Sequence, residues 1–178
     1  MKKHQGFTVW FTGIPCCGKT TIADQVATLL KKKDYTVERL DGDVVRQGLT
    51  SDLGFSKKDR DENIRRITFV AKMLTRNNVV VLATFVSPYR EQRRNARKEI
   101  ERFVEVYVRC PVEICMKRDA KGMYRKALEG KIKHFTGVDD PYEEPEHPEL
   151  ILNTDTESLE ESVKKVMHTI EELGYITW

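Results

Sequence analysis

An eight-residue stretch near the start of the chain has the spacing of a loop that binds the phosphates of a nucleotide. It combines two glycines, a lysine and a hydroxyl residue in the order Gly13-Ile14-Pro15-Cys16-Cys17-Gly18-Lys19-Thr20. In this pattern backbone N–H groups surround the phosphates, the lysine reaches the β- and γ-phosphates, and the hydroxyl binds Mg²⁺. An apolar run precedes the loop and a helix-like segment opens at Thr21, which is the strand–loop–helix context that the motif requires. We therefore predict a site for a nucleoside triphosphate.

Two carboxylates follow the next expected strand. Asp41 and Asp43 flank a glycine directly after residues 36–40, which we expect to form a strand. Carboxylates at the carboxyl edge of a parallel sheet can hold Mg²⁺ or accept a proton from an attacking hydroxyl. The run at residues 79–85 ends without an aspartate, so Asp41 or Asp43 is the expected substitute for the usual acidic partner of the metal. Asp-Gly-Asp is also a common turn sequence, and its position is what favours a functional role.

Arginines and one aromatic residue come next in the chain. Arg46, Arg60, Arg65 and Arg66 carry planar guanidinium groups that suit phosphate and sulfate oxygens. Arg65 and Arg66 are neighbours on an expected helix, so at most one faces a given pocket and the other should pair with a surface acid. Phe55 lies in a loop beside a glycine, where it could stack on a base or simply belong to the core.

The elements that must position these residues alternate along the chain. We expect strands at residues 7–12, 36–40, 79–85, 103–108 and 150–152. Helical patterns fall at residues 20–33, 57–77, 89–100, 112–118 and 158–173. This alternation predicts a three-layer α/β fold with a five-stranded parallel sheet and ligands at the carboxyl ends of the strands. We expect one domain over residues 1–178, with a polar segment at 121–148 that has few apolar anchors.

The composition limits the class of protein. The 178 residues are 39% hydrophobic and 33% charged with a net charge of +3, which fits one globular domain and indicates no nucleic-acid partner. No apolar run approaches the roughly 20 residues that span a bilayer, so we expect no membrane contact and a cytoplasmic location. The four cysteines lack zinc-site spacing and should be reduced. We expect the helix N-terminus and Lys19 to lower the thiol pKa of Cys16 and Cys17.

Five further blocks, at residues 41–46, 52–56, 59–66, 85–90 and 135–143, make the chain resemble the adenylylsulfate kinase (APS kinase) family of P-loop kinases. The match covers nearly the whole chain in order. The resemblance implies transfer of the ATP γ-phosphate to the 3′-hydroxyl of adenosine 5′-phosphosulfate (APS) with Mg²⁺, as in sulfate assimilation. The products would be 3′-phosphoadenosine 5′-phosphosulfate (PAPS) and ADP.

The resemblance also implies roles for individual residues. Catalytic residues would be Lys19, Asp41, Asp43 and Ser87, and the metal would lie at Thr20 and Asp43. ATP would bind the loop from Gly13 to Thr20 with Thr21, and Arg118 would lie against its adenine. APS would contact Asp41, Asp43, Arg46, Phe55, Arg60, Asn63, Val86, Ser87, Lys121, Phe135 and Thr136. Ser87 is either a phosphoryl carrier or a binding residue, and direct in-line transfer is the simpler route.

Further expectations concern motion, assembly and departures from the family. The segment at about 121–148 would be a mobile lid that closes over both nucleotides, and the resemblance implies a homodimer, with association with sulfate adenylyltransferase as a further expectation. The loop departs from the family because Pro15 lacks an N–H and Cys16 replaces a glycine.

Two alternatives stay open: another small P-loop kinase acting on a nucleoside monophosphate or sugar, and a nucleotide-binding regulatory module without turnover.

Overall fold

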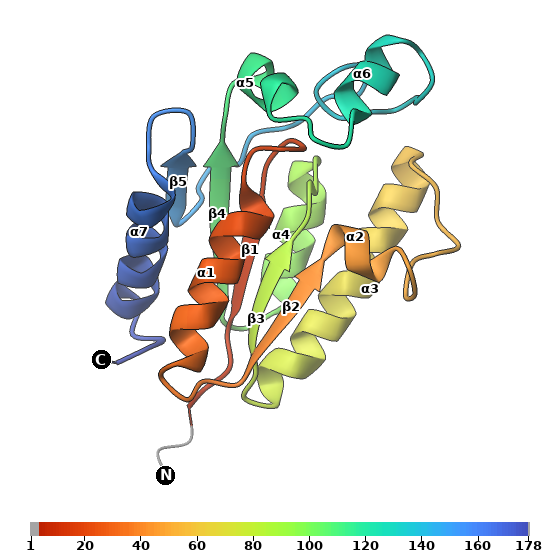
Figure 1. Cartoon of the computed structure of the whole chain (residues 1–178). Helices are drawn as coiled ribbons and strands as arrows, with labels where there is room; N and C mark the ends of the chain where they lie inside the picture. The colour runs from red at the N-terminus through yellow and green to blue at the C-terminus, as the bar shows by residue number, and fades with distance from the viewer. Residues whose placement is uncertain (1–3, 178) are drawn as a thin grey trace.

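A five-stranded parallel sheet forms the centre of the molecule (Figure 1). The computed structural model describes residues 4–177, and the strand order is β2-β3-β1-β4-β5. The strands are β1 (Thr8–Thr12), β2 (Val37–Asp41), β3 (Val80–Thr84), β4 (Phe103–Arg109) and β5 (Leu150–Asn153). The prediction of five parallel strands is confirmed, and each predicted end lies within one residue of the observed one.

Two layers of helices cover the sheet. Helices α1 (Lys19–Lys31) and α7 (Leu159–Glu172) lie on one face, and α3 (Lys57–Arg76) and α4 (Arg90–Glu99) lie on the other (Figure 1). Helix α5 (Val112–Lys117) lies at the carboxyl end of the sheet. With helices on both faces of the sheet, the three-layer α/β architecture is confirmed.

None of the helices between residues 4 and 177 has both the length and the apolar composition to cross a membrane.

The core has one half on each face of the sheet. Val26 of α1 and Val166 of α7 pack on one side, and Ile67 of α3 and Ala96 of α4 pack with Trp10 on the other. All five residues of β1 and of β3 are buried, as expected for strands covered on both faces. The loops at the carboxyl ends of these rigid strands consequently hold their side chains in fixed positions.

Two short helices were absent from the sequence-based prediction. Helix α2 (Gly42–Val45) begins directly after β2, where the Asp41 carboxylate accepts a hydrogen bond from the backbone N–H of Asp43. Helix α6 (Met123–Leu128) begins beside Asp119, whose carboxylate accepts from the N–H groups of Met123 and Tyr124. Both helices are shorter than two turns, so no apolar period could reveal them, and a side-chain acceptor stabilises each start.

The segment at residues 121–148 is better anchored than its composition suggested. Tyr124, Ala127 and Phe135 are buried and belong to the same apolar cluster as α1. The Tyr124 hydroxyl also donates a hydrogen bond to the Pro15 carbonyl of the phosphate loop, at 2.9 Å. A few buried side chains thus hold this largely polar segment against the rest of the fold.

Candidate active site

The loop between β1 and α1 has the backbone conformation that its glycine spacing predicts. Gly13 has φ +152°, and a Cβ atom there would lie 2.4 Å from the Val108 carbonyl oxygen, so only glycine fits. Cys16 has φ +62°, a left-handed conformation that costs about 1 kcal/mol for a residue with a side chain. The departure from glycine at this position is thus tolerated with some strain.

The Lys19 side chain bonds back to the backbone of this loop. Its Nζ donates to the carbonyl oxygens of Gly13 and Ile14, each at 2.8 Å. The amine therefore lies at the centre of the loop, where the phosphates of a nucleotide would meet it.

Asp41 is connected to the loop although β3 lies between β1 and β2. Its Oδ2 accepts hydrogen bonds from the hydroxyls of Thr20 (2.8 Å) and Thr84 (2.7 Å). Burial alone would raise the pKa of Asp41, but the bonds from Thr84 and Thr20 and from the Asp43 N–H outweigh it and hold the pKa below its ordinary value. Asp41 is thus an ionised acceptor that orients the Thr20 hydroxyl.

The Thr20 and Asp43 side chains suit a magnesium ion. Because Thr20 gives its hydroxyl proton to Asp41, the lone pairs of its oxygen can face a cation. The Asp43 carboxylate is exposed and forms an ion pair with Lys121. Between residues 4 and 177 there is no group of three or more His, Cys, Asp and Glu side chains arranged to hold a metal. A magnesium ion would therefore take its other ligands from phosphate oxygens and water, as is usual for this ion.

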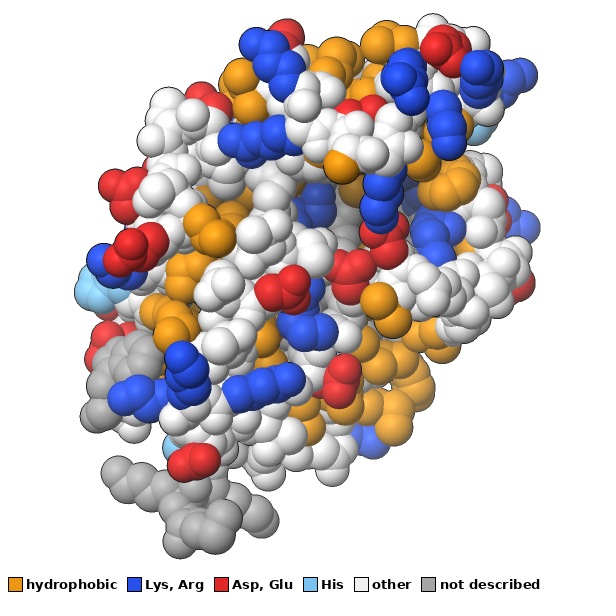
Figure 2. All heavy atoms as spheres, viewed as in Figure 1, with side chains coloured by type: hydrophobic (Ala, Val, Ile, Leu, Met, Phe, Trp, Pro, Cys, Tyr) orange, Lys and Arg blue, Asp and Glu red, His pale blue; other side chains and the backbone are white. Residues whose placement is uncertain are grey.

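One cavity of about 770 Å³ brings most of the predicted residues together. Figure 2 shows basic and acidic side chains around the hollow on this face of the molecule. Its walls include Pro15, Cys16, Gly18, Lys19, Thr20, Thr21, Asp41, Asp43, Arg46, Phe55, Arg60, Asn63, Val86, Ser87, Arg118, Lys121, Phe135 and Thr136. Three predicted loop residues, Gly13, Ile14 and Cys17, are not part of this wall.

Basic and aromatic groups lie together at one end of the cavity. The Arg46 guanidinium lies 4.4 Å from the centre of the Phe55 ring, and Arg60 donates to the Phe55 carbonyl oxygen at 3.0 Å. Phe55 is 47% exposed, so its ring is available to a ligand and is not a core residue. The Oδ1 of Asn63 and the Oγ1 of Thr136 are buried and accept or donate no hydrogen bond among the described residues. Such atoms favour a polar ligand at this end.

Arg65 and Arg66 do not contribute to the cavity wall. Both form ion pairs with Glu62, and Arg66 also pairs with Asp52 at 2.6 Å. The expectation that one of them pairs with a surface acid is confirmed, and here it holds for both.

Ser87 is a buried residue in the cavity wall. It is 2% exposed and has φ +39°. Its Oγ accepts a hydrogen bond from the Trp10 indole N–H (3.0 Å) and donates to the Thr12 hydroxyl (3.0 Å). The Ser87 hydroxyl therefore both accepts from and donates to neighbouring side chains.

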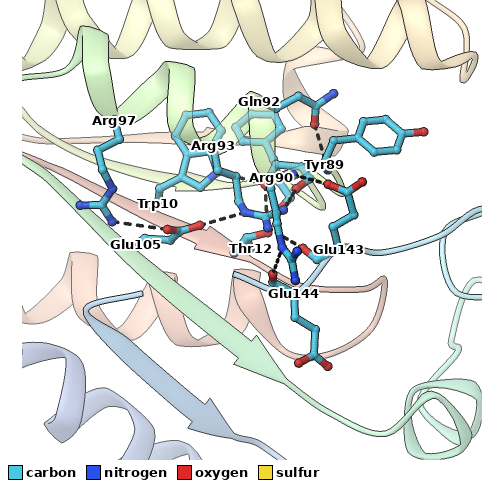
Figure 3. A network of polar contacts seen from close by, with 12 residues as sticks. Trp10, Thr12, Tyr89, Arg90, Gln92, Arg93, Arg97, Glu105, Glu143 and Glu144 are labelled. Atoms are coloured by element: carbon cyan, nitrogen blue, oxygen red, sulfur yellow. Dashed lines mark hydrogen bonds and ion pairs between the residues drawn. The ribbon is translucent and has the colours of Figure 1, made fainter. Parts of the chain in front are cut away.

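Arg93 of α4 was missed by sequence analysis, although it connects three separate segments of the chain and contacts the backbone of Ser87 in the cavity wall (Figure 3). The side chain is 2% exposed, and its Nε donates to Glu105 Oε1 at 2.9 Å. Its two terminal nitrogens donate to the carbonyl oxygens of Ser87 and Glu143. The guanidinium thus joins β4, the loop that follows β3 and the segment at residues 121–148. Helix α4 contains several arginines, and the sequence does not show which of them is buried. Only the packing of distant segments around the helix distinguishes Arg93.

The thiols of the loop differ in accessibility. Cys17 is fully buried and Cys16 is half-buried in the cavity wall. Burial, assisted by the nearby Asp119 carboxylate, raises the pKa of Cys16 despite the opposing effect of Lys19. The expected lowering of this pKa was therefore wrong.

Alkylation with a small thiol reagent is expected to modify Cys16 first and to block nucleotide binding, because the added group would lie in the cavity. Because its raised pKa keeps Cys16 mostly protonated at neutral pH, the rate of alkylation should increase as the pH rises toward the pKa of the thiol. Mass spectrometry after partial alkylation, with and without ATP, checks this, and the variant Cys16→Ser is the control that should resist inactivation. Full nucleotide binding by protein alkylated at Cys16 would contradict the prediction.

Comparison with known proteins gives a consistent result. A family model described as adenylylsulphate kinase matches residues 5–153. The adenylyl-sulfate kinase of Halothermothrix orenii is 57% identical over 176 residues, which cover 99% of this chain and 95% of that protein. The adenylyl-sulfate kinase of a Picosynechococcus species is 56% identical over 175 residues, covering 98% and 99% of the two chains.

Solved structures agree. The APS kinase of Mycobacterium tuberculosis in complex with AMPPNP and APS is 42% identical and superposes with a TM-score of 0.91, covering 94% of this chain and 99% of that one. A hexameric APS kinase from Thiobacillus denitrificans is 37% identical with a TM-score of 0.76, and the match covers 98% of this chain and 30% of that chain. A sugar kinase from a Janibacter species is 17% identical with a TM-score of 0.68 and shares only the fold.

Proposed function

Because the chain belongs to the adenylylsulphate kinase family, we propose a specific role for each part of its cavity in that family's reaction. The protein is an ATP-dependent kinase that transfers the γ-phosphate of ATP to the 3′-hydroxyl of APS, giving PAPS and ADP. The observation that carries the assignment of sites is that the cavity of about 770 Å³ has two unlike ends. A phosphate loop lies at one end, and paired arginines with an exposed phenylalanine lie at the other.

ATP takes the loop end. The loop N–H groups and Lys19 bind its phosphates, and Arg118 lies against its base, held by hydrogen bonds to the Thr154 carbonyl oxygen (2.6 Å) and hydroxyl (3.3 Å). Thr20 and Asp43 would hold Mg²⁺, which when bound supplies charge neutralisation at the phosphates. This leaves the protein mainly the task of aligning donor and acceptor.

APS takes the opposite end. Arg46 and Arg60 bind its phosphosulfate and ribose with Asn63, and Phe55 and Phe135 flank its adenine. The unpartnered atoms of Asn63 and Thr136 support this assignment, because a bound nucleotide would satisfy them.

Asp43 is better suited than Asp41 to receive the proton of the attacking hydroxyl. The Asp41 oxygens already accept three hydrogen bonds, whereas the Asp43 carboxylate is exposed at the mouth of the cavity. Asp41 then acts as a positioning residue through Thr20. The resemblance had suggested both as catalytic, and we assign contact with the reacting atoms to Asp43.

Residues 121–148 form a lid in this proposal. The Lys121–Asp43 ion pair and the Tyr124–Pro15 hydrogen bond connect the segment to both halves of the site, so its closure would exclude water. Homodimerisation, association with sulfate adenylyltransferase and a cytoplasmic location stay predictions of the family resemblance.

An assay of ADP release coupled to NADH oxidation tests the proposal. We expect turnover with ATP and APS, and none when AMP replaces APS. Turnover only with another acceptor would favour a different P-loop kinase, and binding of both nucleotides without ADP release would favour a regulatory module.

The variant Ser87→Ala is expected to retain turnover within about tenfold, because direct transfer needs no phosphoserine and the variant loses only the hydrogen bonds of Ser87 with Trp10 and Thr12. The same assay, with the melting temperature as a folding control, checks this. Loss of all turnover in a folded Ser87→Ala protein, together with a phosphate on Ser87 of the wild type, would establish the covalent route instead.

A further inference from the structure

The ATP end of the cavity continues past the phosphate loop to the start of α7. There the wall is formed by Ile22 of α1, by Arg118 and Thr154, and by Glu157, Leu159 and Ser162. If the loop binds the phosphates as proposed above, on which this inference rests, this part of the cavity receives the base. Ile22 and Leu159 are apolar, and the guanidinium of Arg118 is planar, so the pocket suits a flat heterocycle.

Two side-chain oxygens in this wall are unsatisfied. The Oε2 of Glu157 and the Oγ of Ser162 are buried and form no hydrogen bond with any residue between 4 and 177. Ser162 is 1% exposed, and the Glu157 side chain is 11% exposed. Helix α7 is fixed here by its capping box, in which Ser158 accepts from the Glu161 N–H at 3.2 Å. The two oxygens are therefore held in place by a well-defined helix start.

The contacts of Glu157 within the protein use only its other oxygen. Oε1 accepts from the Asn153 N–H at 3.0 Å and pairs with Lys165 at 2.9 Å. Burial would raise the pKa of Glu157, but the bonds from Lys165 and Asn153 outweigh it and lower the pKa, so the carboxylate is ionised at neutral pH. Leaving one oxygen of a buried carboxylate without a donor is unfavourable. A ligand that brings an N–H group to Oε2 removes this cost.

We propose that Glu157 selects the base of the donor nucleotide by accepting a hydrogen bond from the exocyclic amine of adenine, with the Ser162 hydroxyl as a second contact to the base edge. An ionised carboxylate has no proton to donate. A purine with an oxo group in place of the amine would direct an acceptor at Oε2 and leave both groups unpaired. The pocket should thus favour ATP over inosine triphosphate (ITP), in which an oxo group replaces the exocyclic amine and the neighbouring ring nitrogen N1 carries a proton.

Isothermal titration calorimetry with ATP and with ITP tests the proposal without requiring turnover. We expect the wild type to bind ATP at least about tenfold more tightly than ITP, and Glu157→Gln to reduce that ratio by about tenfold or more, because a carboxamide can also donate to the oxo group. Glu160→Gln is the matched control, since Glu160 lies on the same helix, pairs with Lys164 and does not line the cavity. It should keep the wild-type ratio.

Ser162→Ala supplies an independent measurement should Glu157→Gln fold poorly. It removes an oxygen with no partner, so we expect an unchanged or higher melting temperature and a roughly threefold to tenfold weaker affinity for ATP. An unchanged ATP-to-ITP ratio in folded Glu157→Gln, or an unchanged ATP affinity in Ser162→Ala, would overturn the proposal. Failure of the proposed function would look different: the wild type would bind ATP but release no ADP with APS.

Discussion

Replacing Lys19 by methionine is expected to lower kcat/KM for ATP by roughly 10²–10³, because removing a positioned charge from a transferring phosphoryl group costs about 3–4 kcal/mol of transition-state stabilisation. The Nζ now bonds to the carbonyl oxygens of Gly13 and Ile14 at 2.8 Å, so the amine is already placed within the loop. Methionine keeps the length of the side chain without its charge. Steady-state kinetics with ATP varied at saturating APS measures the effect.

Lys117→Met is the matched control, because Lys117 is an exposed residue at the end of α5 and is not part of the cavity wall. It should keep wild-type kinetics. The KM for APS should stay nearly constant in both variants, since Lys19 lies at the other end of the cavity from Arg46 and Arg60. A Lys19→Met enzyme with kcat/KM within threefold of the wild type would show that the amine does not act on the phosphates.

Replacing Arg93 by methionine is expected to destabilise the fold by about 3–5 kcal/mol, because it leaves the buried Glu105 carboxylate without its main partner. Glu105 is 6% exposed and accepts from Arg93 at 2.9 Å, while Arg97 approaches it at 3.4 Å and supplies only part of the compensation. The carbonyl oxygens of Ser87 and Glu143 also lose their donors. Urea unfolding at neutral pH measures the free energy of unfolding.

Arg94→Met on the same helix is the control, since Arg94 is exposed and its replacement should change stability by no more than about 0.5 kcal/mol. The double variant Arg93→Met with Glu105→Leu should recover part of the loss, because it removes both charges together. Additive losses in the double variant would contradict the assignment of a coupled buried pair.

The phosphate loop and the order of the elements were predictable from the sequence. The loop depends on residues within eight positions of one another, and its backbone N–H groups bind phosphate whatever lies elsewhere in the chain. The strands were found to within a residue because β1 and β3 are continuous apolar runs covered on both faces. The family blocks predicted which residues bind APS because their residue types recur in order along the chain.

The contacts between distant segments were not predictable. Neither the bond from Thr20 to Asp41, across 21 residues, nor that from Tyr124 to Pro15, across 109, leaves any pattern in the sequence. The missed roles of Arg93 and Glu157 have the same cause, because each depends on which groups pack beside it and which of its atoms stay unpaired. The wrong expectation for the Cys16 pKa arose similarly, from burial by neighbouring segments.

The sequence by itself therefore predicted the phosphate loop and the alternating fold, which follow from local spacing and apolar periodicity, whereas the class of reaction came from the resemblance to a known family. Only the tertiary structure decided that Asp41 orients Thr20 while Asp43 stays exposed, that Ser87 is held by Trp10 and Thr12, and that the lid segment is anchored by Tyr124. Hydrogen bonding and burial are properties of the packed chain, and they set the charge, orientation and accessibility on which the chemistry of each side chain depends.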